Sequence, residues 1–437
     1  MLKLTRIAAA LLALSAIPAL AQQGAPLNQD VTTRVDAMYP WLDAIYKDLH
    51  AHPEIAFQET RTAGKLAAEM RKLGFTVTEK VGKTGVVAVL RNGAGPTVLV
   101  RTDMDGLPME EKTGLPYASR ARATSEGRET FVTHSCGHDI HMSSWLGAAR
   151  TLVELKSQWK GTLVFIGQPA EEIVSGAKAM LDDGLFKRFP KPDYAFALHS
   201  WPLAHGTVGF NDGPVSSNSD SLEITFKGRG GHGSAPDKTV DPIAIAARFV
   251  VDVQTVVSRE KDPKEFGVVT VGAINGGTVG NIIPDSVQVR GTIRSYSPQV
   301  RVKLLEGVRR VAEGAAAMAG APRPEMLIGG GGKAIVNSTE LVNKTEAVFK
   351  EAFGADKAVR MPAMTASEDF SLYANEGVPS MFFFTGVYDP KDVAEAEREG
   401  GKPIAFNHSP AYAPVPEPSI KTSARAMTLA VLNVLAK

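Results

Sequence analysis

The chain has 437 residues, enough for two domains, and its hydrophobic and charged fractions of 44% and 22% are typical of soluble globular proteins. These values exclude disordered, collagen-like and disulfide-scaffold proteins. Lysine and arginine number 48 against 47 aspartate and glutamate, a net charge of +1, and no basic run occurs, so we expect no nucleic-acid partner and no attraction to an anionic membrane.

The first 21 residues have the pattern of a secretory signal peptide. Two cations precede an apolar run, residues 7–20, which closes with the small-x-small cleavage pattern Ala19-Leu20-Ala21. A membrane anchor is the alternative, but it needs about 20 apolar residues, so we expect no stable membrane span. The sequence predicts an exported protein, periplasmic or secreted after cleavage. Its single cysteine, Cys136, allows no intrachain disulfide.

Strands alternate with helices over the first half of the chain. Apolar residues recur at helical spacing over residues 60–73, and a second helix is expected at residues 140–155. Strand-like runs occur at residues 75–81, 86–90, 97–101, 162–167 and 194–198. This alternation predicts an α/β domain with a mixed, largely parallel sheet.

A second unit is expected to begin after Gly213-Pro214, where the chain becomes polar. Two helices among three or four strands follow in about 115 residues, with predicted ranges 222–227, 242–257, 267–273, 287–294 and 300–318. This pattern indicates a small α+β sandwich, residues 215–329, inserted into a larger domain of residues 30–214 and 330–437. A helix from about residue 338, a strand at 380–384 and a helix at 420–435 would return to the larger sheet.

Acidic side chains follow two of the predicted strands. The strand at residues 97–101 leads into Asp103-Met104-Asp105, and the strand at 162–167 leads into Glu171-Glu172. In α/β sheets, functional sites form at the carboxyl ends of the strands. Since adjacent side chains point apart, one glutamate can bind a metal while its neighbour moves protons at the reacting centre. Solvated acidic loops are the alternative.

The densest group of potential metal ligands is His134-Ser135-Cys136-Gly137-His138-Asp139-Ile140-His141, which holds the only cysteine and three of the nine histidines. A thiolate and an imidazole two residues apart suit a borderline-soft divalent metal such as zinc. His199 ends the predicted strand at 194–198, and His408 lies in a polar loop. Each of these two, taken alone, is more typical of a structural histidine.

Taken together, these motifs resemble the amidohydrolase branch of the aminoacylase/carboxypeptidase metallopeptidase family, which includes hippurate hydrolases and indole-acetyl-amino-acid hydrolases. The resemblance covers roughly residues 35–437 and also includes His52-Pro53-Glu54, Glu59, Leu107-Pro108 and Ser367-Glu368-Asp369-Phe370. It implies a metallopeptidase catalytic domain with two divalent metal ions, zinc first and manganese, cobalt or nickel as alternatives. The implied ligands are Cys136, which would bridge, and His138, Glu172, His199 and His408.

The same resemblance assigns the remaining roles. Glu171 would be the general base and later the acid, and Asp105 would orient a metal ligand. The inserted unit resembles the family's ferredoxin-like lid and dimerisation domain, which implies a homodimer. Three of its residues match substrate contacts: His232, which could stabilise the oxyanion across a dimer, and Asn281 and Arg294, which suit a carboxylate. Surface or structural roles are the alternative for these three.

The sequence therefore predicts a metal-dependent amidohydrolase that acts on N-acyl amino acids or related small amides, with a metal-bound hydroxide attacking the carbonyl. A carboxypeptidase or dipeptidase acting on small peptides shares all of these residues and remains an alternative, as does an inactive binding protein. The polar stretch Arg120–Thr130 is longer than the connection usual in the family, and it lies close to the metal-binding motif.

Overall fold

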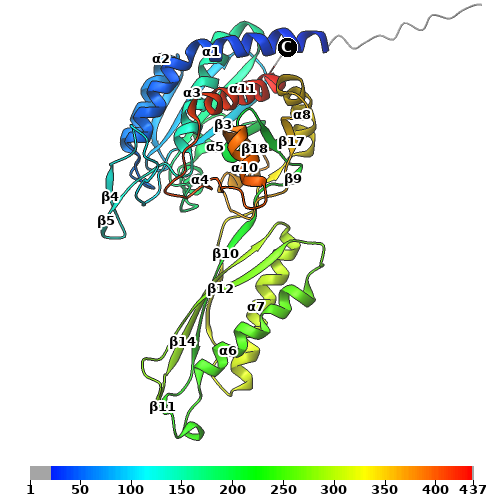
Figure 1. Cartoon of the computed structure of the whole chain (residues 1–437). Coiled ribbons are helices and arrows are strands. Elements are labelled where there is room, and N and C mark those ends of the chain that lie inside the picture. Colours follow the sequence, from blue (N-terminus) through cyan, green and yellow to red (C-terminus); the bar gives the residue numbers. More distant parts are fainter. Residues whose placement is uncertain (1–20, 436–437) are drawn as a thin grey trace, which may run out of the picture.

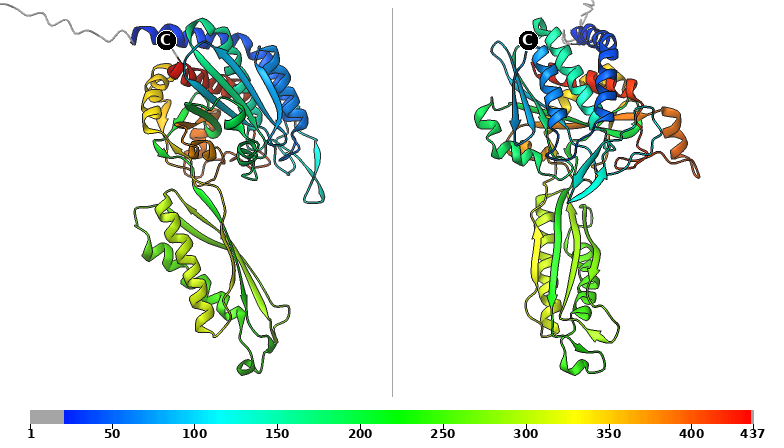
Figure 2. Two further views of the ribbon diagram at one scale, coloured as in Figure 1. Left: turned by 180° about the vertical axis from the view of Figure 1, so that it is seen from behind. Right: turned by 90° about the vertical axis from the view of Figure 1, so that its left-hand side faces the viewer.

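The computed structural model describes residues 21–435, so the predicted signal peptide falls outside the described residues except for Ala21, which begins helix α1 (Ala21–Ala51). The described chain forms a larger unit around an eight-stranded sheet and an inserted unit, residues 218–329, that extends from it as an elongated lobe (Figures 1 and 2). Within residues 21–435, no helix combines the length and the apolar character needed to cross a bilayer.

The sheet of the larger unit is mixed, with a parallel centre. Its order is β1-β2-β6-β3-β7-β18-β8-β17, and the four central strands β6, β3, β7 and β18 run parallel. The strands are β1 (Thr76–Val81), β2 (Gly85–Asn92), β3 (Thr97–Asp103), β6 (Gly161–Gln168), β7 (Tyr194–Ala204), β8 (Val208–Phe210), β17 (Ala358–Arg360) and β18 (Ser380–Tyr388). The predicted mixed, largely parallel α/β sheet is confirmed.

Helices cover both faces of this sheet. One face packs against α1, α2 (Thr60–Lys72), α3 (His138–Glu154), α8 (Thr339–Phe353) and α11 (Pro416–Leu435). The other face packs against α4 (Gly176–Asp182), α5 (Leu185–Arg188) and α9 (Ser371–Asn375). Helix α1 is absent from the sequence prediction, although Val31, Val35 and Leu42 lie on its fully buried face. Since α3 lies between the sheet and both α1 and α11, it is buried on nearly all sides.

The inserted unit has the order strand, helix, two strands, helix, strand. Its strands are β10 (Asn218–Lys227), β12 (Gly267–Asn275), β14 (Ser286–Ser295) and β15 (Glu325–Gly329), and its helices are α6 (Pro242–Asp252) and α7 (Pro298–Met318). The antiparallel sheet has the order β12-β14-β10-β15, which is the ferredoxin-like arrangement. The predicted helix at 242–257 ends early, because a π-helical segment, Val256–Glu260, follows α6.

Short elements connect the two units and decorate them. The two chain crossings run side by side where β9 (Gly213–Pro214) pairs with β16 (Val336–Asn337). At the far end of the inserted unit, β11 (Gly231–His232) pairs with β13 (Ile282–Ile283) (Figure 1). Helix α10 (Pro390–Glu397) and the one-turn 3-10 helices Lys156–Gln158 and Pro236–Lys238 lie in loops.

The polar stretch Arg120–Thr130 forms a β-hairpin that projects from the larger unit (Figure 1). Its strands are β4 (Arg122–Ser125) and β5 (Arg128–Phe131). The turn residues Glu126 and Gly127 have φ angles of 50° and 76°, and two positive φ values in succession are what a tight hairpin turn requires. This hairpin is absent from the sequence prediction.

Candidate metal centre

A cavity of about 320 Å³ lies at the carboxyl ends of the central parallel strands. Strand β6 leads into Glu171 and Glu172, β7 carries His199, and Cys136 directly precedes Gly137 and helix α3. The residues that line the cavity are Cys136, Glu171, Glu172, Val174, His199, Trp201, Arg294, Met364, Ala366, Ser367, Glu368, Phe406, Asn407 and His408. Eight of the ten predicted site residues thus lie at or beside this cavity: six line it, and His138 and Asp105 contact lining residues directly.

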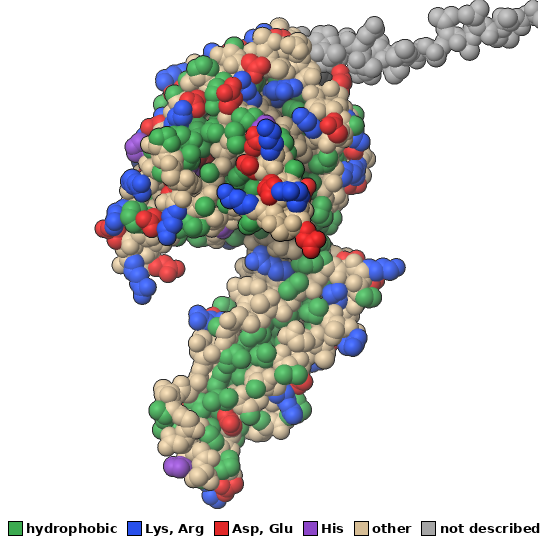
Figure 3. Space-filling model, viewed as in Figure 1, with side chains coloured by type: hydrophobic (Ala, Val, Ile, Leu, Met, Phe, Trp, Pro, Cys, Tyr) green, Lys and Arg blue, Asp and Glu red, His purple; other side chains and the backbone are tan. Residues whose placement is uncertain are grey.

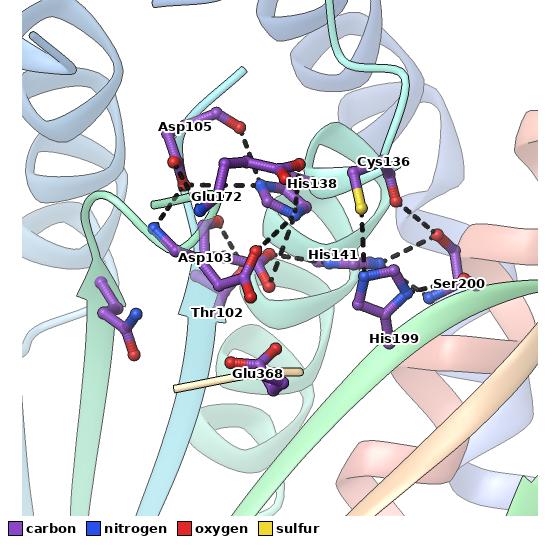
Figure 4. A network of polar contacts seen from close by, with 12 residues as sticks. Thr102, Asp103, Asp105, Cys136, His138, His141, Glu172, His199, Ser200 and Glu368 are labelled. Atoms are coloured by element: carbon purple, nitrogen blue, oxygen red, sulfur yellow. Dashed lines mark hydrogen bonds and ion pairs between the residues drawn. The ribbon is translucent and has the colours of Figure 1, made fainter. Parts of the chain in front are cut away.

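The five predicted metal ligands converge within a few ångströms of one another, and Figure 4 shows four of them, Cys136, His138, Glu172 and His199. The Cys136 Sγ lies 3.3 Å from His199 Nε2, and His408 Nε2 lies 3.2 Å from Glu172 Oε2. Two sets of donor atoms each fit within 4.8 Å: Cys136 with His138 and His199, and Cys136 with Glu172 and His408. Because the thiol belongs to both sets, the arrangement fits two cations that share one ligand.

Two of the buried donor atoms lack hydrogen-bond partners in the described part of the chain, as expected of atoms that bind a cation. His138 Nε2 and Glu172 Oε1 lie 3.8 Å apart, and both are buried without a hydrogen-bond partner among the described residues. Unpaired buried polar atoms are costly unless a ligand satisfies them. Burial and the two neighbouring glutamates raise the pKa of the Cys136 thiol well above its ordinary value, so it would ionise only beside a bound cation.

The backbone fixes which nitrogen of each histidine faces the donors. His138 Nδ1 donates to the Asp105 carbonyl oxygen at 2.7 Å, and His199 Nδ1 donates to the Ser200 carbonyl oxygen at 2.7 Å. Because a carbonyl can only accept, both Nε2 atoms carry a lone pair. Burial lowers the pKa of both imidazoles and keeps them neutral, the state that binds metal. Gly137 lies between Cys136 and His138 and has a φ of 85°. Any other residue at this position would clash, because its Cβ would lie 2.2 Å from Ser200 Oγ.

Glu171 lines the same cavity, and the surroundings of its buried carboxyl group favour the protonated form. Its Oε2 lies 3.8 Å from His138 Nε2, and Glu368 and Asp369 approach its other side. Burial first, and then the charges of Glu368 and Glu172, raise the pKa of Glu171 well above its ordinary value. A carboxyl group with a raised pKa can both take and return a proton near neutral pH, as a general acid and base must.

A buried polar network that was not predicted from the sequence lies beneath the donors. Arg101 donates to Asp103 at 2.7 Å, to Gln168 at 3.0 Å and to both oxygens of Glu368 at 2.7 and 3.2 Å. Asp103 Oδ1 in turn lies 2.7 Å from His141 Nδ1 (Figure 4). Asp103, His141 and Glu368 stand inside the quoted motifs, whereas a single arginine within an apolar strand carries no local signal of this kind.

The three predicted substrate contacts do not come together in one chain. Arg294 lines the cavity, and its Nη1 is buried without a hydrogen-bond partner in the described structure. His232, in β11, and Asn281, just before β13, are exposed at the far end of the inserted unit (Figure 1). The unit is elongated, and its sheet carries Arg294 at the end next to the larger unit.

An α/β sheet that presents thiol, imidazole and carboxylate donors at its carboxyl edge, beside a buried glutamate, defines a metal-dependent hydrolase. A model of the Peptidase family M20/M25/M40 matches residues 99–400. The chain is 35% identical over 343 residues to an N-acetylcysteine deacetylase of Bacillus subtilis, which covers 78% of this chain and 86% of the relative. It is 38% identical over 337 residues to a hippurate hydrolase of Campylobacter jejuni, with coverages of 76% and 84%.

The fold agrees with these relatives. A solved structure of a dinuclear metal-binding peptidase of the M20 family from Bacillus subtilis matches with a TM-score of 0.74 and 30% identity, covering 91% of this chain and 99% of that chain. The chain belongs to the peptidase family M20/M25/M40. The predicted resemblance to the amidohydrolase branch and the predicted enzyme class are confirmed.

Proposed function

We propose that the protein hydrolyses the amide bond of N-acyl amino acids. The observation that carries this proposal is that two donor sets sharing Cys136 face the same cavity as the buried Glu171. Cys136, His138, Glu172, His199 and His408 would hold two divalent ions, with Cys136 between them. Thiolate and imidazole ligands favour zinc over manganese, cobalt or nickel. When bound, such ions polarise the amide carbonyl and make water acidic.

The protein's own residues supply the proton transfers. Glu171 would take a proton from the attacking water and return it to the leaving amine nitrogen, a role typically worth about 10²–10⁴-fold in rate. Asp105 would keep this geometry, because its carbonyl oxygen binds His138 and its carboxylate accepts the Glu171 and Glu172 amides, each at 3.0 Å. Arg294 would bind the substrate carboxylate with the fork of its guanidinium group.

The inserted unit would act as a lid and dimerisation domain, residues 215–329, and a homodimer would complete the site. His232 and Asn281 lie too far along the unit to reach the cavity of their own chain, so they would serve a partner's cavity. Strands β12 and β15 form the two edges of the inserted unit's sheet. The side chains of Val268, on β12, and Leu327, on β15, are exposed. Figure 3 shows hydrophobic side chains running along this unit.

The activity is tested by measuring free-amine release from N-acetyl and N-benzoyl amino acids and from dipeptides after loading with zinc. Wild type should release amine, whereas Glu171→Gln should lose about 10²-fold or more while keeping its metal content. A preference for dipeptides would instead favour the alternative carboxypeptidase or dipeptidase. Silence with two metals bound would favour a binding protein.

The dimer is tested by mixing two inactive variants, Glu171→Gln and His232→Ala. If each cavity uses the partner's His232, half of the dimers in a random mixture contain one intact site, and about a quarter of the wild-type activity returns. No recovery on mixing would contradict the shared site. We also propose export with removal of residues 1–21, which N-terminal sequencing of the protein from expressing cells tests.

A further inference from the structure

The turn that follows β6 has an unusual backbone. Ala170 and Val174, neither of them glycine, have φ angles of 50° and 52°, in the left-handed region that side chains disfavour. Such conformations persist where surrounding contacts hold them. Here the turn carries Glu171 and Glu172, and both side chains line the cavity. The direction in which Glu171 points therefore depends on what holds Ala170.

Two carboxylates bind three successive amides of this turn. The Ala170 N–H donates to Glu59 at 2.8 Å, and the next two amides donate to Asp105 at 3.0 Å each. A carboxylate can only accept hydrogen bonds, so both acids act here as fixed anchors for N–H groups. Asp105 belongs to the site already described. Glu59 lies on a different segment, directly before α2, and does not line the cavity.

Glu59 is fully buried, and both oxygens of its carboxylate accept hydrogen bonds. One oxygen accepts from the amides of Ala170 and Phe57, and the other accepts from Thr84 Oγ1 at 2.6 Å. Phe57 also has a positive φ, 61°. The same oxygen therefore binds the amides of two residues that hold left-handed conformations.

Stabilising α2 does not explain this side chain. Glu59 occupies the N-cap position of α2, yet its side chain makes no capping hydrogen bond. Glu54 binds the free amides of that helix instead, accepting from Arg61 N–H at 3.1 Å and Thr62 N–H at 2.8 Å. The Glu59 side chain is directed to the turn after β6.

We propose that Glu59 is a positioning residue that holds Ala170 in its left-handed conformation and so aims Glu171 at the substrate. Because it rests on the proposed function, the inference needs a readout that does not depend on activity. Glu54 supplies a matched control, since it is also a carboxylate that accepts two backbone amides in the same segment, but from α2 rather than from the turn after β6.

The experiment compares Glu59→Met, which keeps the side-chain length without an acceptor, with Glu59→Gln and Glu54→Met in the zinc-loaded full chain. With N-benzoyl or N-acetyl amino acids, Glu59→Met should lower kcat by about 10–10²-fold, with KM and metal content within about twofold of wild type. Glu59→Gln should recover most of kcat, because its amide oxygen can accept both N–H groups and its NH₂ can donate to Thr84. Glu54→Met should leave kcat within about twofold.

Hydrogen–deuterium exchange provides the second readout. In Glu59→Met, the amides of residues 169–176 should exchange about tenfold faster or more, whereas Glu54→Met should instead accelerate exchange at residues 60–63. If Glu59→Met does not fold, Thr84→Val removes one of the hydrogen bonds to Glu59 and should give smaller effects in the same direction.

Several outcomes would overturn the inference. Unchanged exchange at residues 169–176 would show that Glu59 does not hold the turn. Faster exchange with unchanged kcat would show that the turn does not control catalysis, and a loss of kcat matched by a loss of metal would assign Glu59 a structural role. If wild type hydrolyses none of the amides while exchange responds as expected, the proposed function fails and the anchoring of the turn stands.

Discussion

Replacing Arg101 by methionine should destabilise the larger unit strongly. The side chain is fully buried on β3, and its guanidinium group donates to Asp103, Gln168 and Glu368, with Asp369 Oδ1 at 3.4 Å. Because the site is buried, loss of this cation would leave three carboxylates without their common partner and without solvent to compensate for it. Removing one member of a buried ion pair typically costs about 3–5 kcal/mol, so we expect a loss in that range or above it.

Arg360 provides the control for this measurement. It donates two N–H groups to Glu346, the closer at 2.6 Å, but its side chain is 45% exposed, and exposed pairs contribute only about 0.2–1 kcal/mol. Arg360→Met should therefore cost less than about 1 kcal/mol. Both substitutions remove a guanidinium group and keep an apolar stem of similar length.

Urea unfolding followed by tryptophan fluorescence measures the difference. All four tryptophans lie in the larger unit, so the signal reports that unit without contribution from the inserted one. Glu368→Gln in the Arg101→Met background should recover part of the loss, because it removes one of the uncompensated charges. If Arg101→Met costs no more than Arg360→Met, the buried network does not stabilise the fold and the reasoning is wrong.

Three further outcomes are expected. The rings of Trp201 and Phe406 form an edge-to-face pair in the cavity lining, with centroids 5.0 Å apart. Trp201→Ala or Phe406→Ala should therefore lower kcat/KM for N-benzoyl substrates about tenfold more than for N-acetyl substrates. Equal losses would contradict an aromatic subsite. Although burial lowers the pKa of His50, the hydrogen bonds that its ring donates to Asp139 and Glu111 raise it from 6.5 to about 10. Stability from protonated His50 should be complete below pH 6.5 and lost as the pH rises through 10, so wild type should lose more stability than His50→Gln over that window in thermal melts. Chelation of the metal should lower the melting temperature and zinc should restore it, whereas an unchanged melting temperature on chelation would argue against metal binding to the folded state.

Local patterns in the sequence located most elements of the larger unit. The predicted strand at 162–167 and helix at 140–155 correspond to β6 (Gly161–Gln168) and α3 (His138–Glu154). Hydrophobic periodicity is a property of neighbouring residues, so it can be read without the fold. Helix α1 was missed even though its buried residues repeat at helical spacing, and the hairpin after Arg120 was missed because its strands are short and polar.

Some of the predicted metal donors have a local signature in the sequence. Cys136 and His138 lie within one turn, and Glu171 and Glu172 directly follow a buried strand. His199 and His408 could be assigned only through the resemblance to a family. The structure brings these residues together because β6 and β7, which lead to Glu171 and Glu172 and carry His199, end at one edge of the sheet, where the start of α3 and the loop with His408 also lie.

Only the tertiary structure decided which distant residues meet. The buried charge of Arg101 is tolerated because Glu368, 267 positions away in the chain, accepts hydrogen bonds from it. The resemblance predicted Arg294, His232 and Asn281 as substrate contacts without giving their distances, and the fold puts Arg294 at the cavity and the other two at the far end of the inserted unit. Sequence fixes which side chains a short segment presents, but the distance between segments depends on how whole units pack and on where their connections enter.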